Sequence, residues 1–318
     1  MVLFLDEAQV TDLLDMPSCI DALDAAFRDK AEGLASNQGR RRIPVAGRRF
    51  IVMAGTMTQS TTPQGGWCAI KAYGVGRSMD VFLYKAGEGL VAVMHASRLG
   101  KVRTGAASGL ATKYMARADA SRLGCFGTGD QAETQILAVA AVRRLDSIHV
   151  YGRDPQRRRE FAQKMSGLLG REVIPVDRPE DAVKGRDIIV TMTNASTPLF
   201  DGRLVEPGTH INAAGANLRI NRELDEHAVT RAGLIATDDV EGARNECGDL
   251  DWPIQRGLMA WEKVYELAPI VAGRMAGRRS AGEITLFESQ GIALEDAAAG
   301  RLVYERALER GIGTKLPF

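Results

Sequence analysis

Six residues near the middle of the chain, Gly127-Thr-Gly-Asp-Gln-Ala132, have the spacing of a phosphate-binding turn. The apolar run Leu123–Phe126 precedes them, and a helical pattern from Glu133 to about Arg144 follows. In a G-x-G-x-x-A turn, the first glycine permits the tight bend and the second lets a pyrophosphate approach the backbone. The small alanine lets the helix pack against the strand. We therefore predict a dinucleotide site at Gly127, Thr128, Gly129, Asp130, Gln131 and Ala132; the alternative is a glycine-rich turn without a ligand.

The end of the next expected strand, Ile148–Tyr151, bears on the choice of cofactor. An acidic residue at such a strand end bonds the ribose hydroxyls of NAD(H) and repels a 2′-phosphate. Here the strand runs into Gly152, which is not acidic, and Arg153 follows at once. A guanidinium makes charge-assisted hydrogen bonds to a phosphate, and the run Arg157-Arg158-Arg159 adds positive charge. These residues favour NADP(H) over NAD(H); alternatively, Asp154 binds the ribose and the arginines form a solvated helix face.

Strands and helices alternate from Ser121 onward, which predicts a parallel sheet with right-handed crossovers. Ligands of such sheets bind beyond the carboxyl ends of the strands. Residues at two later strand ends are therefore expected to contact the nicotinamide and its ribose: Thr193, Asn212, Ala214 and Gly215. The expected strands of this sheet are Leu123–Phe126, Ile148–Tyr151, Val173–Val176, Ile188–Thr191 and His210–Ala213.

The first hundred residues have the pattern of an α+β unit. Amphipathic periodicity predicts a helix from Pro17 to Leu34, and a run of small residues predicts a second helix from Thr104 to Ala116. Gly87-Glu-Gly89 predicts a hairpin turn. The expected strands are Arg42–Met53, Cys68–Tyr73, Val81–Tyr84 and Leu90–Met94.

One of these strands contains a lysine within the apolar segment Ala69-Ile-Lys-Ala-Tyr73. A buried lysine costs free energy unless it is paired or used. Burial beside other cations lowers the pKa of a lysine, so that it exchanges protons near neutral pH. Lys71 is thus a candidate acid–base group; the alternative is a structural lysine that snorkels to the surface.

Bulk properties exclude several classes of protein. The 318 residues suit two domains, and a content of 45% hydrophobic and 25% charged residues is ordinary for a globular chain. A net charge of +1 gives no general attraction to nucleic acid or to an anionic membrane. No apolar run reaches the roughly 18–20 residues that span a bilayer. The four scattered cysteines, with no metal-ligand spacing, favour free thiols in a reducing cytoplasm.

Over nearly its whole length the chain resembles the ornithine cyclodeaminase/mu-crystallin family. Any single matching segment would be moderate evidence, but their order and spacing together are specific. The matching segments are Lys101–Lys113, Gly127–Ala132, Pro207–Asn217 with Arg222–Asp225, Ile284–Asp296 and Arg310–Lys315.

The resemblance implies an α/β protein with a Rossmann nucleotide-binding domain and a discontinuous α+β domain for substrate binding and dimerisation. We place the Rossmann domain at residues 119–296 and the second domain at residues 1–118 with 297–318. Family members move a hydride between nicotinamide and the α-carbon of an amino or imino acid, unless they only bind ligands. The final helix, about Leu294–Arg310, is expected to pack on the amino-terminal unit.

The resemblance also implies roles for individual residues. Arg103 aligns with the arginine that binds the substrate carboxylate, and Thr104 beside it is expected to contact the cofactor. Lys71 aligns with a lysine that contacts substrate and transfers protons. A second arginine falls within Arg40-Arg41-Arg42, where Arg40 matches by counting and Arg42 lies on the same side of an extended segment.

Asn217 is the main departure from the family pattern. Cyclodeaminases carry an aspartate at this place, whereas an amide cannot accept a proton at neutral pH. This argues against deamination and leaves imine reduction possible, with Asn217 bonding substrate. Asp225 is expected to cap a helix. Asp238 matches a family acid and either faces the cofactor or caps a helix.

The sequence therefore predicts an NAD(P)H-dependent oxidoreductase that transfers hydride to the α-carbon of an imino acid or cyclic ketimine. A homodimer is expected, and no metal, because the four histidines show no ligand spacing. Two alternatives stay open: an ornithine cyclodeaminase that uses another base, and a mu-crystallin-like protein that binds NADPH and a small ligand.

Overall fold

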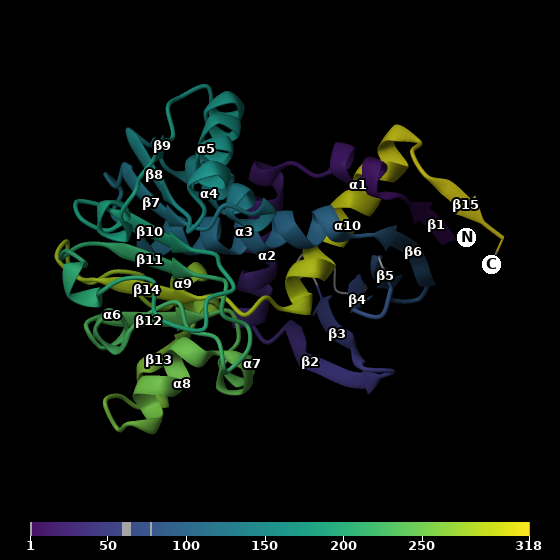
Figure 1. Ribbon diagram of the computed structural model, residues 1–318. Helices are drawn as coiled ribbons and strands as arrows, with labels where there is room; N and C mark the ends of the chain where they lie inside the picture. Colours follow the sequence, from purple (N-terminus) through teal and green to yellow (C-terminus); the bar gives the residue numbers. More distant parts are fainter. Residues whose placement is uncertain (1, 59–64, 77, 318) are drawn as a thin grey trace. The chain divides into compact units, whose positions relative to one another are not determined.

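The computed structural model describes residues 2–58, 65–76 and 78–317 (Figure 1). The chain divides into two compact units: unit 1 contains Met1–Ala106 with Ile292–Phe318, and unit 2 contains Ala107–Gly291. These divisions fall earlier than the expected positions 118 and 296. The first lies inside a continuous helix, α3 (Ser97–Met115), so no loop marks it.

Unit 1 is built on one sheet. Its described residues form seven strands in the order β15-β1-β6-β5-β4-β3-β2. β1 runs parallel to β6, and the other neighbours are antiparallel. The strands are β1 (Val2–Leu5), β2 (Ala35–Val45), β3 (Arg48–Thr58), β4 (Gly66–Tyr73), β5 (Met79–Lys85), β6 (Gly89–His95) and β15 (Thr314–Leu316).

The expected single strand Arg42–Met53 is wrong, because that segment contains the turn of the β2–β3 hairpin. Ala46 and Gly47 have φ angles of 46° and 75°, the left-handed values that a two-residue hairpin turn requires. The sequence Ala-Gly is a weak form of this signal, since asparagine or aspartate usually precedes the glycine. The turn at Gly87 occurs as expected, with φ 80°.

Three further helices complete unit 1: α1 (Glu7–Leu13), α2 (Met16–Ala31) and α10 (Ala293–Arg310). The Asp15 carboxylate caps α2, and Gly311, with φ 64°, ends α10. The expected packing of the last helix is confirmed: α10 lies against α2, β3 and β4 (Figure 1). The close approach needs a glycine, because a Cβ on Gly55 would lie 2.4 Å from the Leu294 nitrogen.

The predicted parallel sheet is confirmed in unit 2. Every neighbouring pair of its eight strands is parallel, in the order β13-β12-β14-β11-β10-β7-β8-β9. The strands are β7 (Arg122–Phe126), β8 (Ser147–Tyr151), β9 (Ile174–Pro175), β10 (Ile188–Thr191), β11 (His210–Ala213), β12 (Leu234–Thr237), β13 (Val264–Glu266) and β14 (Thr285–Glu288). Three of these strands, β12, β13 and β14, are not among the expected ones.

Helices connect these strands and cover the sheet. Successive side chains of β10 alternate between two hydrophobic clusters, with Ile189 in one and Ile188 and Val190 in the other. The connecting helices are α4 (Asp130–Val142), α5 (Pro155–Leu169), η1 (Pro179–Ala182), η2 (Gly202–Leu204), α6 (Glu226–Thr230), α7 (Val240–Glu246), α8 (Gly248–Gln255), η3 (Trp261–Lys263) and α9 (Leu267–Val271). No helix in the described part of the chain is long and apolar enough to span a membrane.

Candidate active site

The glycine-rich turn joins β7 to α4 with the geometry that the sequence predicts. Gly127 has φ 123°, and a Cβ there would lie 2.3 Å from the Met192 carbonyl oxygen. Only glycine fits this position. Gly129 is the N-cap of α4, and a Cβ built on it would meet nothing within 4 Å. Ala132 is fully buried on the first turn of α4.

This turn fits a dinucleotide phosphate. Gly129 provides no side-chain cap for the first turn of α4, and its surroundings are open. The amide groups and the dipole of the helix favour an anion at such an end. The Gln131 Oε1 is buried without a hydrogen-bond partner among the described residues; as an acceptor it suits a hydroxyl of the cofactor and not a phosphate oxygen. Thr128 packs its methyl group where a side chain on Gly152 would stand, so Gly152 permits this approach.

The polar residues after β8 differ in whether their side chains are already bonded within the protein. Asp154 caps α5 by accepting hydrogen bonds from the Gln156 and Arg157 amides, at 2.8 and 3.0 Å. Arg158 is buried, and its guanidinium bonds the Gly152 carbonyl and Asp177. Arg153 is exposed and makes no such bond among the described residues. Arg153, directly after the strand end, therefore has a guanidinium that is available to a ligand, as does the exposed Arg157.

Glu223, which is not among the expected site residues, joins the ends of β10 and β11. Its carboxylate accepts hydrogen bonds from the Thr193 amide and hydroxyl at 2.6 and 2.7 Å and from the Gly215 amide at 2.8 Å. Thr191 donates a fourth bond at 2.9 Å. Burial raises the pKa of Glu223 in spite of these bonds. The carboxylate thus fixes two loops at the edge where we expect the cofactor.

The remaining candidates of unit 2 have varied surroundings. Asn212 is buried and bonds Thr112 and His210, at 2.9 and 3.2 Å. Ala214 donates its amide to the Thr191 carbonyl. Asn217 is exposed. Contact of these residues with cofactor or substrate stays a prediction.

Two aspartates of unit 2 bond backbone amides. The Asp225 carboxylate accepts from the Ala228 amide at 2.8 Å, so its predicted role as a helix cap is confirmed. Asp238 accepts bonds from the Gln290 and Gly291 amides at 2.9 and 2.7 Å. Asp238 therefore holds the segment that follows β14. Its contact with the cofactor stays a prediction.

Unit 1 brings together two predicted residues, Lys71 of β4 and Arg103 of α3, with two acids of α10. The Lys71 Nζ donates to Asp296 Oδ1 at 2.9 Å. Arg103 donates from Nε to Asp296 at 3.1 Å and from Nη1 to Glu295 at 2.7 Å. All four side chains are at most 6% exposed. They form a buried, charge-balanced network.

Burial and the charge of Arg103 lower the pKa of Lys71 to about 8, against the raising effect of Asp296. Arg40 also lowers this pKa, so its charge acts on Lys71. Thr104 is buried and donates its hydroxyl to the Gly100 carbonyl at 2.8 Å. Arg42 lies on the half-buried side of β2, as Arg40 does.

Glu295 and Asp296 are not among the expected site residues. Their signal was two adjacent acids in the first turn of a helix that is otherwise rich in alanine. Such a position favours carboxylates through the helix dipole. The partners are far apart in sequence, however, and only the fold brings them to Lys71 and Arg103.

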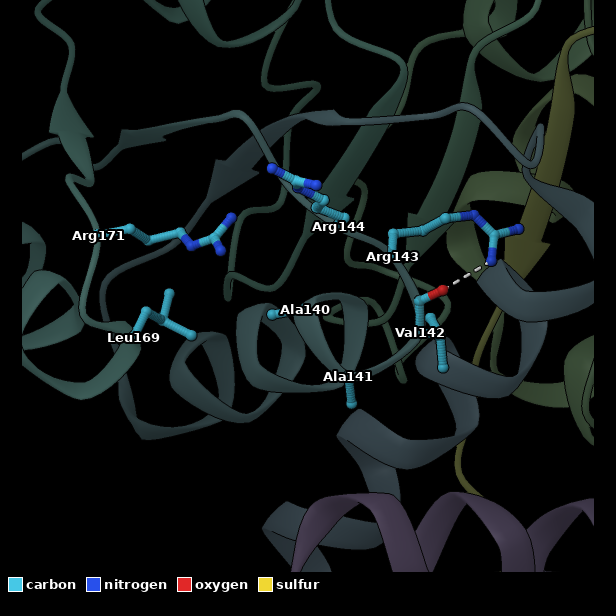
Figure 2. A pocket seen from close by; sticks show the side chains of 7 residues that line it. All are labelled: Ala140, Ala141, Val142, Arg143, Arg144, Leu169 and Arg171. Atoms are coloured by element: carbon cyan, nitrogen blue, oxygen red, sulfur yellow. Dashed lines mark hydrogen bonds between the residues drawn. The ribbon is translucent and has the colours of Figure 1, made fainter.

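A separate open pocket lies at the other end of α4 (Figure 2). Because α4 begins at the carboxyl end of β7, its last turn lies toward the opposite edge of the sheet. Figure 2 shows Arg143 turned away from Arg144 and Arg171, with its Nη1 bonded to the Val142 carbonyl. This pocket contains none of the predicted site residues.

The described histidines have structural partners or lie on the surface. His210 is buried between Thr285 and Asn212, and burial lowers its pKa to about 3. His95 bonds Asp80, and His149 bonds the Asp181 carbonyl. Among the residues described, no group of three or more histidine, cysteine or acidic side chains could hold a metal ion.

Comparison with known proteins identifies the family. The model of the ornithine cyclodeaminase/mu-crystallin family matches residues 2–311. The chain belongs to this family. The resemblance inferred from sequence segments is therefore confirmed.

Three relatives of this family member have the names of oxidoreductases. The chain is 40% identical over 236 residues to Delta(1)-pyrroline-2-carboxylate reductase of Bacillus cereus, covering 74% of this chain and 72% of the relative. The structure of Thermococcus litoralis Delta(1)-pyrroline-2-carboxylate reductase in complex with NADH and L-proline matches with a TM-score of 0.91 and 34% identity. That match covers 99% of this chain and 100% of the other. An archaeal alanine dehydrogenase dimer with bound NAD matches with a TM-score of 0.90 and 28% identity, covering 100% and 99%.

Proposed function

We propose that this protein is an NAD(P)H-dependent reductase of a cyclic imino acid, with Δ¹-pyrroline-2-carboxylate as the first substrate to test. The observation that carries the proposal is the buried lysine–arginine pair of unit 1, Lys71 and Arg103, in a chain that also has a nucleotide-binding turn. The names of the relatives at 34–40% identity support this choice of substrate.

The nucleotide would lie at the carboxyl edge of the unit 2 sheet. Gly127 and Gly129 leave room for its phosphates, and the first turn of α4 supplies amide donors. Thr193 and Gly215, held by Glu223, line the same edge. The bound cofactor supplies the hydride that reduces the imine carbon.

Lys71 supplies the proton. When the α-carbon of an imine accepts a hydride, the nitrogen keeps the former C=N electron pair and requires one proton in total to become an amine. A lysine with a pKa of about 8 is largely protonated at neutral pH and releases its proton readily. Lys71 is therefore suited to be the acid, and solvent restores its proton after each turnover.

The substrate carboxylate would be bound by arginine. Arg103 uses Nε and Nη1 for the acids of α10, and no hydrogen bond of the described residues uses its Nη2. Arg40, whose charge acts on Lys71, is the better second candidate, with Arg42 as the other.

We further propose NADP(H) as the preferred cofactor, because Arg153 is exposed and not engaged in a hydrogen bond. A homodimer in the cytoplasm is also proposed. The archaeal alanine dehydrogenase dimer supports the homodimer, and the free cysteines support a reducing compartment. Light scattering on the purified protein tests the dimer.

The test of function is to follow NADPH and, separately, NADH oxidation with Δ¹-pyrroline-2-carboxylate, Δ¹-piperideine-2-carboxylate, and pyruvate plus ammonia or methylamine. We expect oxidation that depends on the cyclic imine and yields the corresponding amino acid. Cofactor binding without oxidation of any imine would favour a binding protein. Release of ammonia from ornithine with NAD⁺ would favour a cyclodeaminase, which Asn217 in place of an aspartate argues against.

A further inference from the structure

Asp296 is the acid that contacts both cations of the unit 1 network. Its Oδ1 accepts hydrogen bonds from Lys71 Nζ and Arg103 Nε, at 2.9 and 3.1 Å. Its Oδ2 is buried and has no partner among the described residues. The side chain is fully buried in the first turn of α10 and does not bond a backbone amide there. Asp296 is thus a carboxylate whose hydrogen bonds serve only Lys71 and Arg103.

We propose that Asp296 is a positioning residue that orients the Lys71 ammonium group and keeps it protonated until it donates to the substrate. This inference rests on the proposed reductase function, in which Lys71 is the acid. Without Asp296, the lysine would lose both its hydrogen-bond acceptor and the nearest negative charge.

The surroundings of Lys71 explain why a single acid has a large effect on retention of its proton. The strands on either side of β4 place the uncharged Met53 and Val81 opposite it. Arg103 of α3 and Arg40 of β2 both favour loss of its proton, as burial does. On the same strand, Tyr73 presents its ring 5.8 Å from Nζ. Of the charged groups facing Lys71, Asp296 of α10 contributes most to retention of the proton.

Packing restricts the ammonium group further. A Cβ built on Gly100 of α3 would lie 2.9 Å from Lys71 Nζ, so the group rests directly against the helix backbone. With α3 on one side and Asp296 bonded to it, the lysine is held in one orientation. A defined orientation is what proton donation to a bound imine requires.

Glu295 provides a matched control in the same turn of α10. It is also fully buried, and it bonds Arg103 Nη1 at 2.7 Å. Glu295→Gln therefore removes the same charge from the same network without altering the group that bonds Lys71. Asp296→Asn keeps an acceptor oxygen, so the two variants differ chiefly in whether the lost charge belonged to the direct partner of the lysine.

The experiment measures the pKa of Lys71 by NMR of ¹³C-labelled lysine, with Lys71→Arg to assign the signal, alongside the pH profile of kcat/KM for imine reduction. We expect Asp296→Asn to lower the lysine pKa by about one unit or more. The decline in activity at high pH should move down by the same amount. Glu295→Gln should shift both by less. Asp296→Glu, which keeps the charge, should restore the wild-type pH profile with a reduced kcat.

Each other outcome is decisive. An unchanged lysine pKa in folded Asp296→Asn overturns the inference, as does a shifted pKa with an unchanged pH profile. If Asp296→Asn does not fold, Asp296→Glu decides: a profile like that of the wild type supports the inference, and a profile shifted to lower pH overturns it. If the unaltered enzyme reduces no imine, the proposed function itself fails, which the wild-type assay alone reveals.

Discussion

The Glu223 carboxylate accepts a hydrogen bond from the backbone amide of Gly215 at 2.8 Å, although an exposed loop separates the two residues in the sequence. The same carboxylate binds the Thr193 amide at the end of the neighbouring strand. A Cβ on Gly215 would lie 2.3 Å from the Thr193 carbonyl oxygen, so the two strand ends touch. One acid therefore sets the shape of the edge where we propose that the cofactor binds.

Glu223→Gln should weaken this edge, because an amide NH₂ would face groups that are donors themselves. We expect a loss of about 1–3 kcal/mol in unfolding free energy, measured with urea. NADH affinity, measured by fluorescence titration, should fall about tenfold. Glu226→Gln is the control, since Glu226 is 41% exposed and should change neither quantity. Unchanged affinity in Glu223→Gln would contradict the proposed role of this edge.

The two glycines of the nucleotide turn should respond differently to alanine. Gly127→Ala introduces a strained φ and a clash with the Met192 carbonyl, so the fold should lose about 1–3 kcal/mol or more. Gly129→Ala meets no atom of the protein within 4 Å and should leave the unfolding transition nearly unchanged. It should nevertheless weaken NADH binding, because the added methyl occupies the approach of the phosphates. Normal cofactor affinity in Gly129→Ala would argue against phosphate binding at this turn.

Arg153 should determine the choice between the two nicotinamide cofactors. Removing its guanidinium in Arg153→Ala should lower kcat/KM for NADPH by about tenfold or more, with little change for NADH. Arg157→Ala, at another exposed arginine nearby, controls for a general loss of positive charge. Equal effects of both variants, or an unchanged ratio of the two cofactors, would refute the assignment of Arg153.

The Asp187 carboxylate should make the unfolding free energy depend on pH in the acidic range. Although burial acts against it, hydrogen bonds from Arg122 and from the Ser121 and Arg122 amides hold the pKa of Asp187 at about 2, below its unfolded value of 3.8. A lowered pKa stabilises the fold above the unfolded pKa, and this contribution disappears as the pH falls from about 4 to 2. It amounts to about 2 kcal/mol.

Asp187→Asn should therefore be less stable than the parent at pH 6 and approach it near pH 2, as measured by urea unfolding across this range. Asp119→Asn is the control, because Asp119 is 79% exposed and lies 3.7 Å from Arg117. A constant difference between parent and Asp187→Asn at every pH would show that the carboxylate charge is not the cause.

Local signals predicted much of the nucleotide-binding unit. The glycine spacing from Gly127 is a local pattern, although the carbonyl that excludes a side chain there belongs to the distant Met192. The strand Ile188–Thr191 appears as an apolar run. β14 (Thr285–Glu288) was missed because it begins and ends with polar residues that are buried only by neighbouring strands. Periodicity cannot anticipate burial that tertiary contacts impose.

The residues of the candidate site also divide into those that local sequence reveals and those that only the fold reveals. Lys71 stood out because a charge within an apolar strand is locally anomalous. Asp296 did not, since acids in the first turn of a helix are common and its buried partner is 225 residues away. Contact of Arg103 and Asn217 with substrate stays a prediction.

The late position of α10 in the sequence has a consequence for biosynthesis. Strands β1 to β6 leave the ribosome early, but the carboxylates that neutralise Lys71 and Arg103 follow only after the whole of unit 2 has been made. Until then, the cations of unit 1 lack the acids that allow their burial. On the ribosome, the amino-terminal sheet therefore stays incompletely packed until unit 2 and then α10 have been synthesised.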